Sequence, residues 1–374
     1  MQKKISILYI ISRIDKALAF EWLADDLDRE IFSPSFILLN PGPSRLMAYL
    51  KTKNLPVTTL RLSGKGSYAR VLIQLWWILV RKQPDIIHCH LFDATVLGMI
   101  AGKMAGIKRR IFTRHHSTIH HTTNPEGLKW DRLCNWLSTD IVAVSKNIRD
   151  ILVRQDHAPD HKIRLVVHGF NLSYFESQKK DRVSSLRSKY KVPEQRYPVI
   201  GVISRYLEWK GIQYIIPALV KLKNDYPGLH LILANANGDY KPEIGKLLGK
   251  LPVENFIEIP FEEDLAALYG LFDIFIHIPV DPSSEAFGQV YIEALLSGVP
   301  SIFTLSGIAG EMIRNRENAL VVDFKNSEQI YRAVLEILRD ENLRKNIIAR
   351  SRDSVLDYSM ENHINLLQNL YLNR

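Results

Sequence analysis

Cysteines and long apolar segments are scarce in this sequence. Cys89 and Cys134 are the only cysteines among 374 residues, too few for a disulfide framework, which excludes small disulfide-stapled scaffolds and favours a reducing compartment. No uninterrupted apolar segment reaches the ~20 residues that a helix needs to span a bilayer. The first residues, with Lys3 and Lys4 before a short apolar segment, lack the pattern of a signal peptide. We therefore expect a soluble, cytoplasmic protein.

Zinc-ligand spacings and RNA-binding signatures are also missing. The net charge of +9 is compatible with an anionic membrane surface, with nucleic acid or simply with solubility. Without a supporting signature we expect no nucleic-acid partner. A chain of 374 residues exceeds what one hydrophobic core usually supports, so we expect two domains.

Short β-rich segments alternate with helix-length segments, the pattern of parallel α/β units. Because buried parallel strands are continuously apolar, we expect strands at 5–10, 35–39, 57–60, 85–88, 110–113, 141–144 and 163–167, and a second series at 199–203, 229–234, 255–259, 274–277 and 301–304. The polar stretch over 178–196 is the expected linker. These patterns predict α/β domains over residues 1–180 and 190–355, followed by a helical segment over 356–374 with Ile364, Leu367 and Tyr371 at helical spacing.

The most informative segment is 285–300, which reads Glu-Ala-Phe-Gly-Gln-Val-Tyr-Ile-Glu-Ala-Leu-Leu-Ser-Gly-Val-Pro. Glu285 and Glu293 lie eight positions apart around the start of an apolar, helix-forming segment that ends at Gly298 and Pro300. A helix N-terminus presents unpaired N–H groups and partial positive charge, which suit a phosphate. The two glutamates could then bind hydroxyls on either side of that phosphate. The segment predicts a sugar-nucleotide site with a binding group made of Phe287, Gly288, Gln289, Val290 and Glu293.

Two carboxylates can also serve a glycosidase, and a surface helix can carry two glutamates by chance. A glycosidase pair needs carboxyl groups about 5–9.5 Å apart. Eight helical residues at a rise of about 1.5 Å each separate the two backbones by roughly 12 Å. A binding pair therefore fits the spacing better than a hydrolytic pair, and the surface helix stays open as an alternative.

Cationic residues follow another expected strand. Arg205 and Lys210 come after the strand that ends near Ser204, and Gly211 opens the next helix. A diphosphate leaving group develops negative charge as its glycosidic bond breaks, and preorganised cations stabilise that charge. Arg205 would act as a planar fork and Lys210 as a point charge. The alternative is two solvated charges at a strand end.

His115 and His116 follow the expected strand at 110–113. A neutral imidazole there could hydrogen-bond a sugar hydroxyl or steady developing charge, and His115 is our candidate. His88 and His90 alternate at a strand end, which favours a structural role. The six histidines between 88 and 121 suggest a metal, but none has ligand spacing with a carboxylate or cysteine partner. We therefore expect no metal.

Two segments combine basic and aromatic residues. Residues 103–132 contain seven Lys and Arg together with Phe112 and Trp130, a mixture that suits an anionic interface. Peripheral membrane contact is a hypothesis for that segment. Residues 65–82, which include Trp76 and Trp77, are basic at their ends and apolar within, and we expect them to form a buried helix.

The segment from Glu285 to Glu293 strongly resembles the Glu-x7-Glu signature of the family 4 retaining glycosyltransferases, whose GT-B fold has two facing Rossmann-like domains. Further landmarks of that family match in their usual order at 85–90, 113–116, 144–146, 168–171 and, as the diphosphate element, 204–211. The resemblance implies that Glu285 contacts the transferred sugar and Glu293 the ribose. It also implies roles in neutralising the diphosphate for Arg205 and Lys210, a functional histidine at His115, and a final helix that crosses back onto the first domain.

The chain departs from the family pattern at three places. Residues 12–21, the loop after the first strand, contain no glycine, although the family usually has a Gly-Gly pair there and glycine is what a close backbone approach needs. Asn171 stands where Asp is common, and residues 278–284 form a longer lead into Glu285 than usual. These departures bear on the acceptor and on the sugar more than on the reaction class.

The resulting hypothesis is a retaining, metal-independent, hexosyltransferase-like enzyme that moves a sugar from a nucleotide diphosphate donor to a hydroxyl acceptor, with no further cofactor. Expected partners are the nucleotide sugar, an acceptor such as a lipid-linked glycan in surface polysaccharide, lipopolysaccharide or glycolipid synthesis, and the anionic inner face of a membrane. Two alternatives stay open: a sugar-nucleotide epimerase of the same fold, and a catalytically silent nucleotide-sugar-binding protein.

Overall fold

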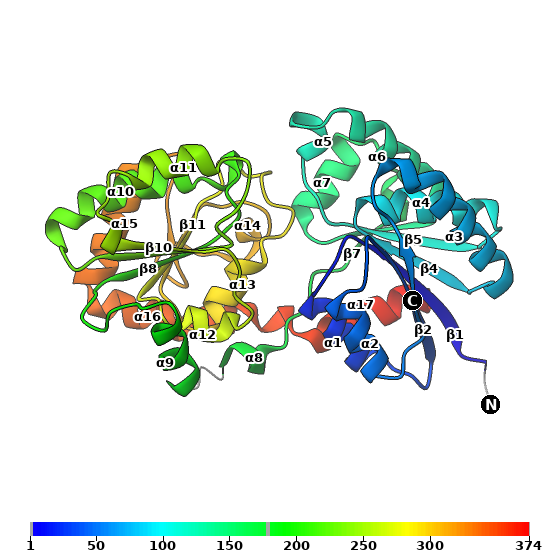
Figure 1. Cartoon of the computed structure of the whole chain (residues 1–374), viewed down its shortest axis with the longest axis horizontal. Helices are drawn as coiled ribbons and strands as arrows, with labels where there is room; N and C mark the ends of the chain where they lie inside the picture. The colour runs from blue at the N-terminus through cyan, green and yellow to red at the C-terminus, as the bar shows by residue number, and fades with distance from the viewer. Residues whose placement is uncertain (1–2, 177–179, 374) are drawn as a thin grey trace. The chain divides into compact units, whose positions relative to one another are not determined.

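The computed structural model describes residues 3–176 and 180–373 and divides into two compact units. Unit 1 consists of Met1–Phe170 and Tyr358–Arg374, and unit 2 of Asn171–Asp357. Each unit is built on one parallel sheet with helices on both faces (Figure 1). The prediction of two parallel α/β domains is therefore confirmed. Among the described residues, every helix falls short of the length and apolarity that crossing a bilayer would require.

The sheet of unit 1 has seven strands in the order β3-β2-β1-β4-β5-β6-β7. In chain order the strands are β1 (Ile5–Ser12), β2 (Phe32–Asn40), β3 (Val57–Arg61), β4 (Ile86–His90), β5 (Arg109–Arg114), β6 (Asp140–Ala143) and β7 (Ile163–Leu165). The central strands β1 and β4 are almost entirely buried because both faces of the sheet are covered.

Helices of unit 1 cover the sheet in two layers (Figure 1). One layer contains α3 (Tyr68–Lys82), α4 (Phe92–Met104), α6 (Glu126–Leu137) and α7 (Lys146–Arg154), and the other contains α1 (Leu18–Asp26), α2 (Arg45–Thr52) and α17 (Met360–Tyr371). The short helix α5 spans Ile119–Thr122.

The last helix, α17, belongs to unit 1 although it follows unit 2 in the chain. It begins at Met360 because the Ser359 hydroxyl caps it, accepting a hydrogen bond from Asn362 N at 3.2 Å. Its apolar face is buried in the unit 1 core. At its end the Tyr371 hydroxyl lies 2.7 Å from His88 Nδ1, and the Arg109 guanidinium donates to the Tyr371 carbonyl at 2.6 Å. His88 therefore has the structural role expected for it.

The sheet of unit 2 has six strands in the order β10-β9-β8-β11-β12-β13. They are β8 (Val199–Ile203), β9 (His230–Ala234), β10 (Phe256–Ile259), β11 (Ile274–His277), β12 (Ser301–Phe303) and the two-residue β13 (Leu320–Val321). One face is covered by α10 (Ile212–Asp225), α11 (Lys241–Leu248) and α15 (Ser327–Arg339), and the other by α12 (Leu265–Tyr269), α13 (Gln289–Leu296) and α16 (Glu341–Ser351) (Figure 1).

The polar stretch expected as a linker contains a helix of unit 2. Helix α9 spans Lys180–Lys189, after the short α8 (Leu172–Glu176). It packs on α12, and its Leu186 is buried. The Arg182 guanidinium donates to Asp264 Oδ2 at 2.7 Å, which fixes the helix to that domain. Residues 177–179, where the expected linker begins, lie outside the described residues.

Candidate active site

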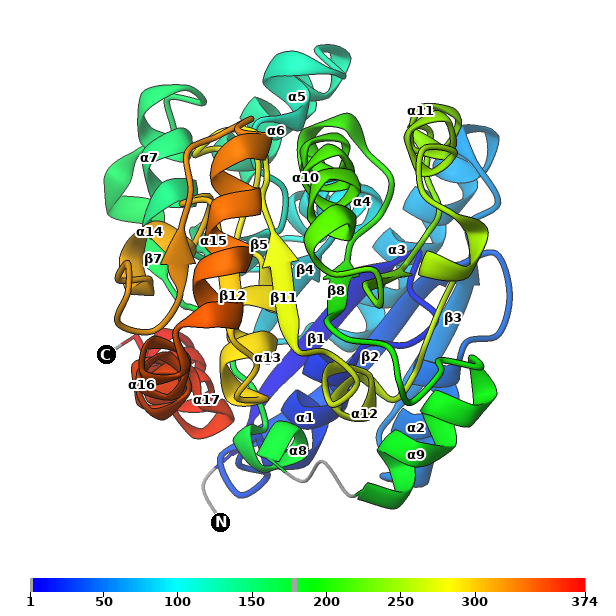
Figure 2. The ribbon, with the colours of Figure 1, turned by 90° about the vertical axis from the view of Figure 1, so that its left-hand side faces the viewer.

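The connections of unit 2 change direction between β8 and β11. These strands are hydrogen-bonded neighbours, and β12 follows β11 on the side away from β8 (Figure 2). The chain thus moves outward to β9 and β10 on one side and to β12 and β13 on the other. In open α/β sheets, ligands bind beyond the carboxyl ends of strands at such a switch point. The segments that follow β8 and β11 meet there, because Val280 N donates to the Trp209 carbonyl at 3.0 Å.

Glu285 is held at this switch point by two basic side chains. Its carboxylate is buried, with Lys210 Nζ and His277 Nε2 both on Oε1, the latter at 2.9 Å. Its backbone N–H donates to Ser306 Oγ at 3.0 Å. Burial alone would raise the pKa of Glu285, but the charge of Lys210 and the hydrogen bond from His277 lower it to about 2. Glu285 is therefore an anion at neutral pH and accepts hydrogen bonds rather than donating a proton.

His277 is the last residue of β11 and is itself buried. Burial lowers the pKa of His277, although the bond to Glu285 opposes this effect, so the ring is neutral with its proton on Nε2 toward the carboxylate. Among the described residues no partner reaches its buried Nδ1. Sequence reasoning counted His277 only as part of an apolar strand. Its place at the carboxyl end of a central strand was the signal that could have identified it.

Two glycines shape the backbone around Glu285. Gly288 has φ +89° and Gly307 φ +58°, in the left-handed region that side chains disfavour. A Cβ on Gly288 would lie 2.4 Å from the Tyr291 ring, and one on Gly307 would lie 2.7 Å from the Phe287 carbonyl oxygen. The loops can therefore approach this closely only with glycine at both positions.

Helix α13 begins directly beside Glu285. Gly288 is its N-cap and has no capping side chain, so the amides of Gln289 and Val290 lack intrahelical acceptors. Phe287 is buried, and its carbonyl accepts from Ile308 N at 2.9 Å. The structure thus brings Lys210, Glu285 and the start of α13 together, an arrangement of cation and helix N-terminus that suits an anion.

Glu293 lies on α13 with a different partner. Its buried carboxyl accepts a hydrogen bond from the Tyr269 hydroxyl at 3.0 Å. Burial raises the pKa of Glu293 to about 7, and the tyrosine bond offsets only part of this effect. The two glutamates of one motif therefore have opposite shifts, because only Glu285 has a cation beside it.

Arg205 follows β8 and is exposed. Within the described part of the chain its guanidinium makes no ion pair, and its carbonyl accepts from Leu207 N at 2.9 Å. Arg205 and Lys210 therefore leave the same strand, but only Lys210 is seen bound to Glu285.

His115, the candidate of unit 1, follows β5 and is half-buried. Its Nε2 lies 3.1 Å from His90 Nδ1, and its ring stacks on His168 with centroids 5.5 Å apart. Burial and the neighbouring His116 lower the pKa of His115 to about 4. The side chain is thus a neutral imidazole at physiological pH.

His116, His120 and Asp131 have ligand atoms within 4.8 Å of one another. The geometry alone would suit a metal. However, Asp131 Oδ2 already accepts from His120 Nδ1 at 2.6 Å and pairs with the buried Arg114 at 2.9 Å. Because a guanidinium supplies the positive charge there, we describe the group as a structural network.

The switch point of unit 1 lies between β1 and β4 and contains side chains rather than glycines. Arg13, the first residue after β1, has φ +50°. Its guanidinium pairs with Asp93 at the start of α4, and the Tyr68 hydroxyl donates to the same carboxylate. Arg13 lies in the loop that contains no glycine, whereas Tyr68 and Asp93 come from the starts of α3 and α4.

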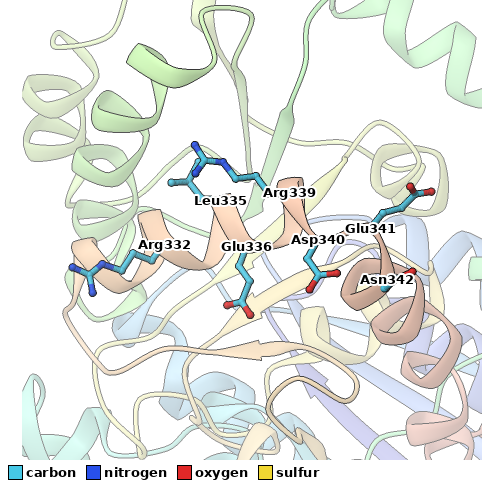
Figure 3. Close-up of a pocket in the computed structure, with 7 residues that line it drawn as sticks. All are labelled: Arg332, Leu335, Glu336, Arg339, Asp340, Glu341 and Asn342. Atoms are coloured by element: carbon cyan, nitrogen blue, oxygen red, sulfur yellow. The ribbon is translucent and has the colours of Figure 1, made fainter.

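A hollow of about 640 Å³ lies elsewhere on unit 2 (Figure 3). It is lined by Arg332, Leu335, Glu336, Arg339, Asp340, Glu341 and Asn342 of α15 and α16. None of these residues belongs to the loops that follow β8 or β11, so we assign the hollow no part in the site.

Comparisons with known proteins cover both units. A model described as Glycosyltransferase Family 4 matches residues 27–174, and one described as Glycosyl transferases group 1 matches residues 182–354. An uncharacterised glycosyltransferase of Methanocaldococcus jannaschii is 24% identical over 79% of this chain and 76% of its own. The capsular polysaccharide biosynthesis glycosyltransferase CapM of Staphylococcus aureus is 23% identical over 76% and 75%. The crystal structure of Anabaena HepE with UDP-glucose superposes with a TM-score of 0.82 at 20% identity, covering 98% of this chain and 100% of HepE.

Proposed function

The chain belongs to the family 4 glycosyltransferases of the GT-B fold, and on that premise we propose that it moves a sugar from a nucleotide diphosphate donor to a hydroxyl acceptor. We include in the proposal that the anomeric configuration is retained and that no metal ion takes part.

The observation that carries the proposal is the Lys210–Glu285 pair beside the N-terminus of α13. A diphosphate at that helix start would meet the amides of Gln289 and Val290. Its charge would attract Lys210 away from Glu285, and Arg205 would supply a second cation. The Glu285 carboxylate, still held by His277, would then accept a hydrogen bond from a hydroxyl of the transferred sugar.

The proposed step is a substitution on one face of the sugar. The bond between the anomeric carbon and the diphosphate oxygen breaks, and the acceptor oxygen forms its bond to that carbon from the same side. The diphosphate leaves with the electron pair of the broken bond and takes the acceptor proton. Stabilisation of its charge by Lys210, Arg205 and the helix amides would be the largest catalytic contribution.

The proposal also gives roles to one further residue of each unit. Glu293 would bind the ribose hydroxyls, which favours its ionised form because a carboxylate accepts two hydrogen bonds. His115, neutral because its pKa is lowered to about 4, would hydrogen-bond the donor sugar.

The relatives suggest the substrate class. CapM is named for capsular polysaccharide biosynthesis and HepE was crystallised with UDP-glucose. We propose a uridine-diphosphate sugar as donor and a lipid-linked precursor of surface polysaccharide, lipopolysaccharide or glycolipid as acceptor. A cytoplasmic protein at the inner face of the membrane would meet both.

A panel of UDP-, GDP- and ADP-sugars in a thermal-shift assay tests the donor, followed by transfer assays with lipid extracts and NMR of the new linkage. We expect one nucleotide class to raise the Tm, transfer that persists in EDTA, and an α-linkage from an α-donor. An isomerised sugar without acceptor would instead identify an epimerase. Binding without transfer to any extract would identify a silent binding protein.

A further inference from the structure

Helix α3 of unit 1 has two apolar faces. Val71, Leu75 and Leu79 are buried. On the other side Ile73 is 56%, Trp77 49% and Val80 38% exposed. At about 100° per residue the exposed three fall within an arc of about 60°, nearly opposite the buried three. No other helix in residues 3–176 and 180–373 carries three large hydrophobic side chains with this exposure.

This outer face corrects the expectation of a buried helix over 65–82. Trp76 packs on Trp77 with ring centroids 5.1 Å apart and extends the exposed apolar arc. A soluble surface helix normally has a single apolar stripe, and a contiguous exposed patch marks an interaction site. The outer face of α3, defined by Ile73, Trp76, Trp77 and Val80, therefore needs an apolar partner.

The charges around the outer face have one sign. Arg70, Arg81 and Lys82 are exposed on α3, and Lys65 is exposed just before it. The Arg81 guanidinium lies 5.6 Å from the Trp77 ring centroid. No Asp or Glu occurs anywhere from residue 31 through residue 84. A partner for this face must therefore combine apolar material with negative charge.

A neighbouring helix end adds to the same surface. Gln83, at the end of α3, donates from Nε2 to the Ala105 carbonyl at the end of α4, at 3.3 Å. Met104 there is 59% exposed, and Lys103 beside it is also exposed. The apolar and basic character thus continues from α3 to the end of α4.

Residues 103–132 are exposed at Lys129, Trp130 and Arg132 of α6, as their sequence suggested, but they do not form one continuous basic and aromatic edge. Phe112 is buried, and so is Arg114. Arg109 and Arg110 donate to backbone carbonyls, at Tyr371 and Leu137. Only the start of that segment, at Lys103 and Met104, joins the surface of α3.

We propose that the outer face of α3 docks unit 1 on an anionic lipid bilayer. Tryptophan rings favour the headgroup region, and flanking Arg and Lys bind anionic lipid while their stems lie along the apolar boundary. A second copy of the chain fits the same face poorly, because a two-fold contact would bring Arg70 and Arg81 of both copies together.

Vesicle sedimentation tests this docking without any sugar donor, so its result is independent of the proposed transfer reaction. We expect the protein to cosediment with vesicles of phosphatidylcholine containing about one-third phosphatidylglycerol, with a blue shift of tryptophan emission and release at high salt. The double variant Ile73→Ser/Trp77→Ser should lower the partition coefficient about tenfold or more. Because both positions are exposed, the Tm of the double variant should equal that of the wild type.

Trp136→Ser is the matched control, because Trp136 is 70% exposed on α6 and lies outside this face. The vesicle partition coefficient of Trp136→Ser should equal that of the wild type. Equal binding by the double variant, or no binding of the wild type to anionic vesicles, would overturn the proposal. A dimer in sedimentation velocity that the double variant converts to monomers would also overturn it, since the occupant would then be a second copy.

Discussion

The two units share a topology but differ at their switch points. Between β8 and β11 of unit 2, left-handed glycines bring backbone close to a buried, cation-paired Glu285. Between β1 and β4 of unit 1, Arg13 occupies a left-handed position without glycine, and its guanidinium binds Asp93 together with Tyr68.

This difference separates what the sheet provides from what the loops provide. Strand order creates a crevice at the carboxyl ends in both units. Only unit 2 adds the backbone approach and the helix start that an anionic phosphate needs. We therefore expect the donor diphosphate to depend on unit 2, while the junction of unit 1 is a closed network of side chains.

Lys210→Ala should have the largest effect. It removes the cation that pairs with Glu285 and that would stabilise the leaving diphosphate, so kcat should fall about a thousandfold, with the fold preserved by circular dichroism. Lys221→Ala is the control, since Lys221 forms an exposed pair with Glu328 at 2.8 Å and its loss should leave kcat unchanged. Near-wild-type turnover of Lys210→Ala would contradict the assignment of the donor diphosphate to unit 2.

Gly288→Ala should weaken donor binding by about a hundredfold, through a disfavoured φ and a clash with Tyr291. Isothermal titration with the nucleotide measures this loss. Gly245→Ala in α11 is the matched control, because a Cβ there meets nothing within 4 Å. Helix propensity should make that control slightly more stable. Unchanged donor affinity in Gly288→Ala would contradict the close backbone approach in unit 2.

Glu293→Gln should change how stability depends on pH. The pKa of Glu293 is raised from 4.5 to about 7, so the folded state keeps a proton that the unfolded chain releases. Stability should therefore fall by ~3 kcal/mol as pH rises from 4.5 to 7 and then level off. The variant should lose this decline in chemical denaturation, whereas Glu317→Gln, exposed on the surface, should retain it. If the stability of Glu293→Gln declined with pH as in the wild type, the raised pKa would belong to a group other than Glu293.

His277→Phe should lower kcat about tenfold, because Glu285 loses the donor that holds it once Lys210 turns to the phosphate. The pKa of Glu285, about 2 in the wild type, should rise in this variant. The acid limb of the pH profile of kcat should therefore move to higher pH. His277→Gln places an amide N–H near the position of Nε2 and should restore much of the rate. A lower kcat in His277→Phe without movement of the acid limb of the pH profile would indicate that His277 has only a packing role.

Sequence reasoning located both sheets because their central strands are largely apolar segments, as β1, β8 and β11 illustrate. It also assigned Lys210 and Glu285 to one site, because the resemblance implies that Lys210 neutralises the diphosphate and that Glu285 contacts the transferred sugar. The two-residue strand β13 was missed because it is too short to form a pattern.

Other features depend on contacts that no local pattern contains. His277 was assigned to an apolar strand, and its bond to Glu285 became visible only with both loops in place. Helix α3 has apolar residues on opposite faces, so periodicity could not indicate which face is buried. Arg114 is one of the seven basic residues of 103–132, whose pattern predicts a surface, but Asp131 and Asp156 neutralise it inside unit 1.

Asp93→Asn should have the smallest effect on donor binding. Asp93 is buried and binds Arg13 and Tyr68, so losing its charge should lower the free energy of unfolding by about 1–3 kcal/mol. The nucleotide Kd should nevertheless stay within about twofold, since a factor of two is only ~0.4 kcal/mol and this network belongs to unit 1. Titration of the folded variant below its Tm separates the two quantities. A tenfold loss of nucleotide affinity would mean that the side-chain network of unit 1 acts on the donor as directly as the glycine loops of unit 2, and the contrast between the two switch points would no longer hold.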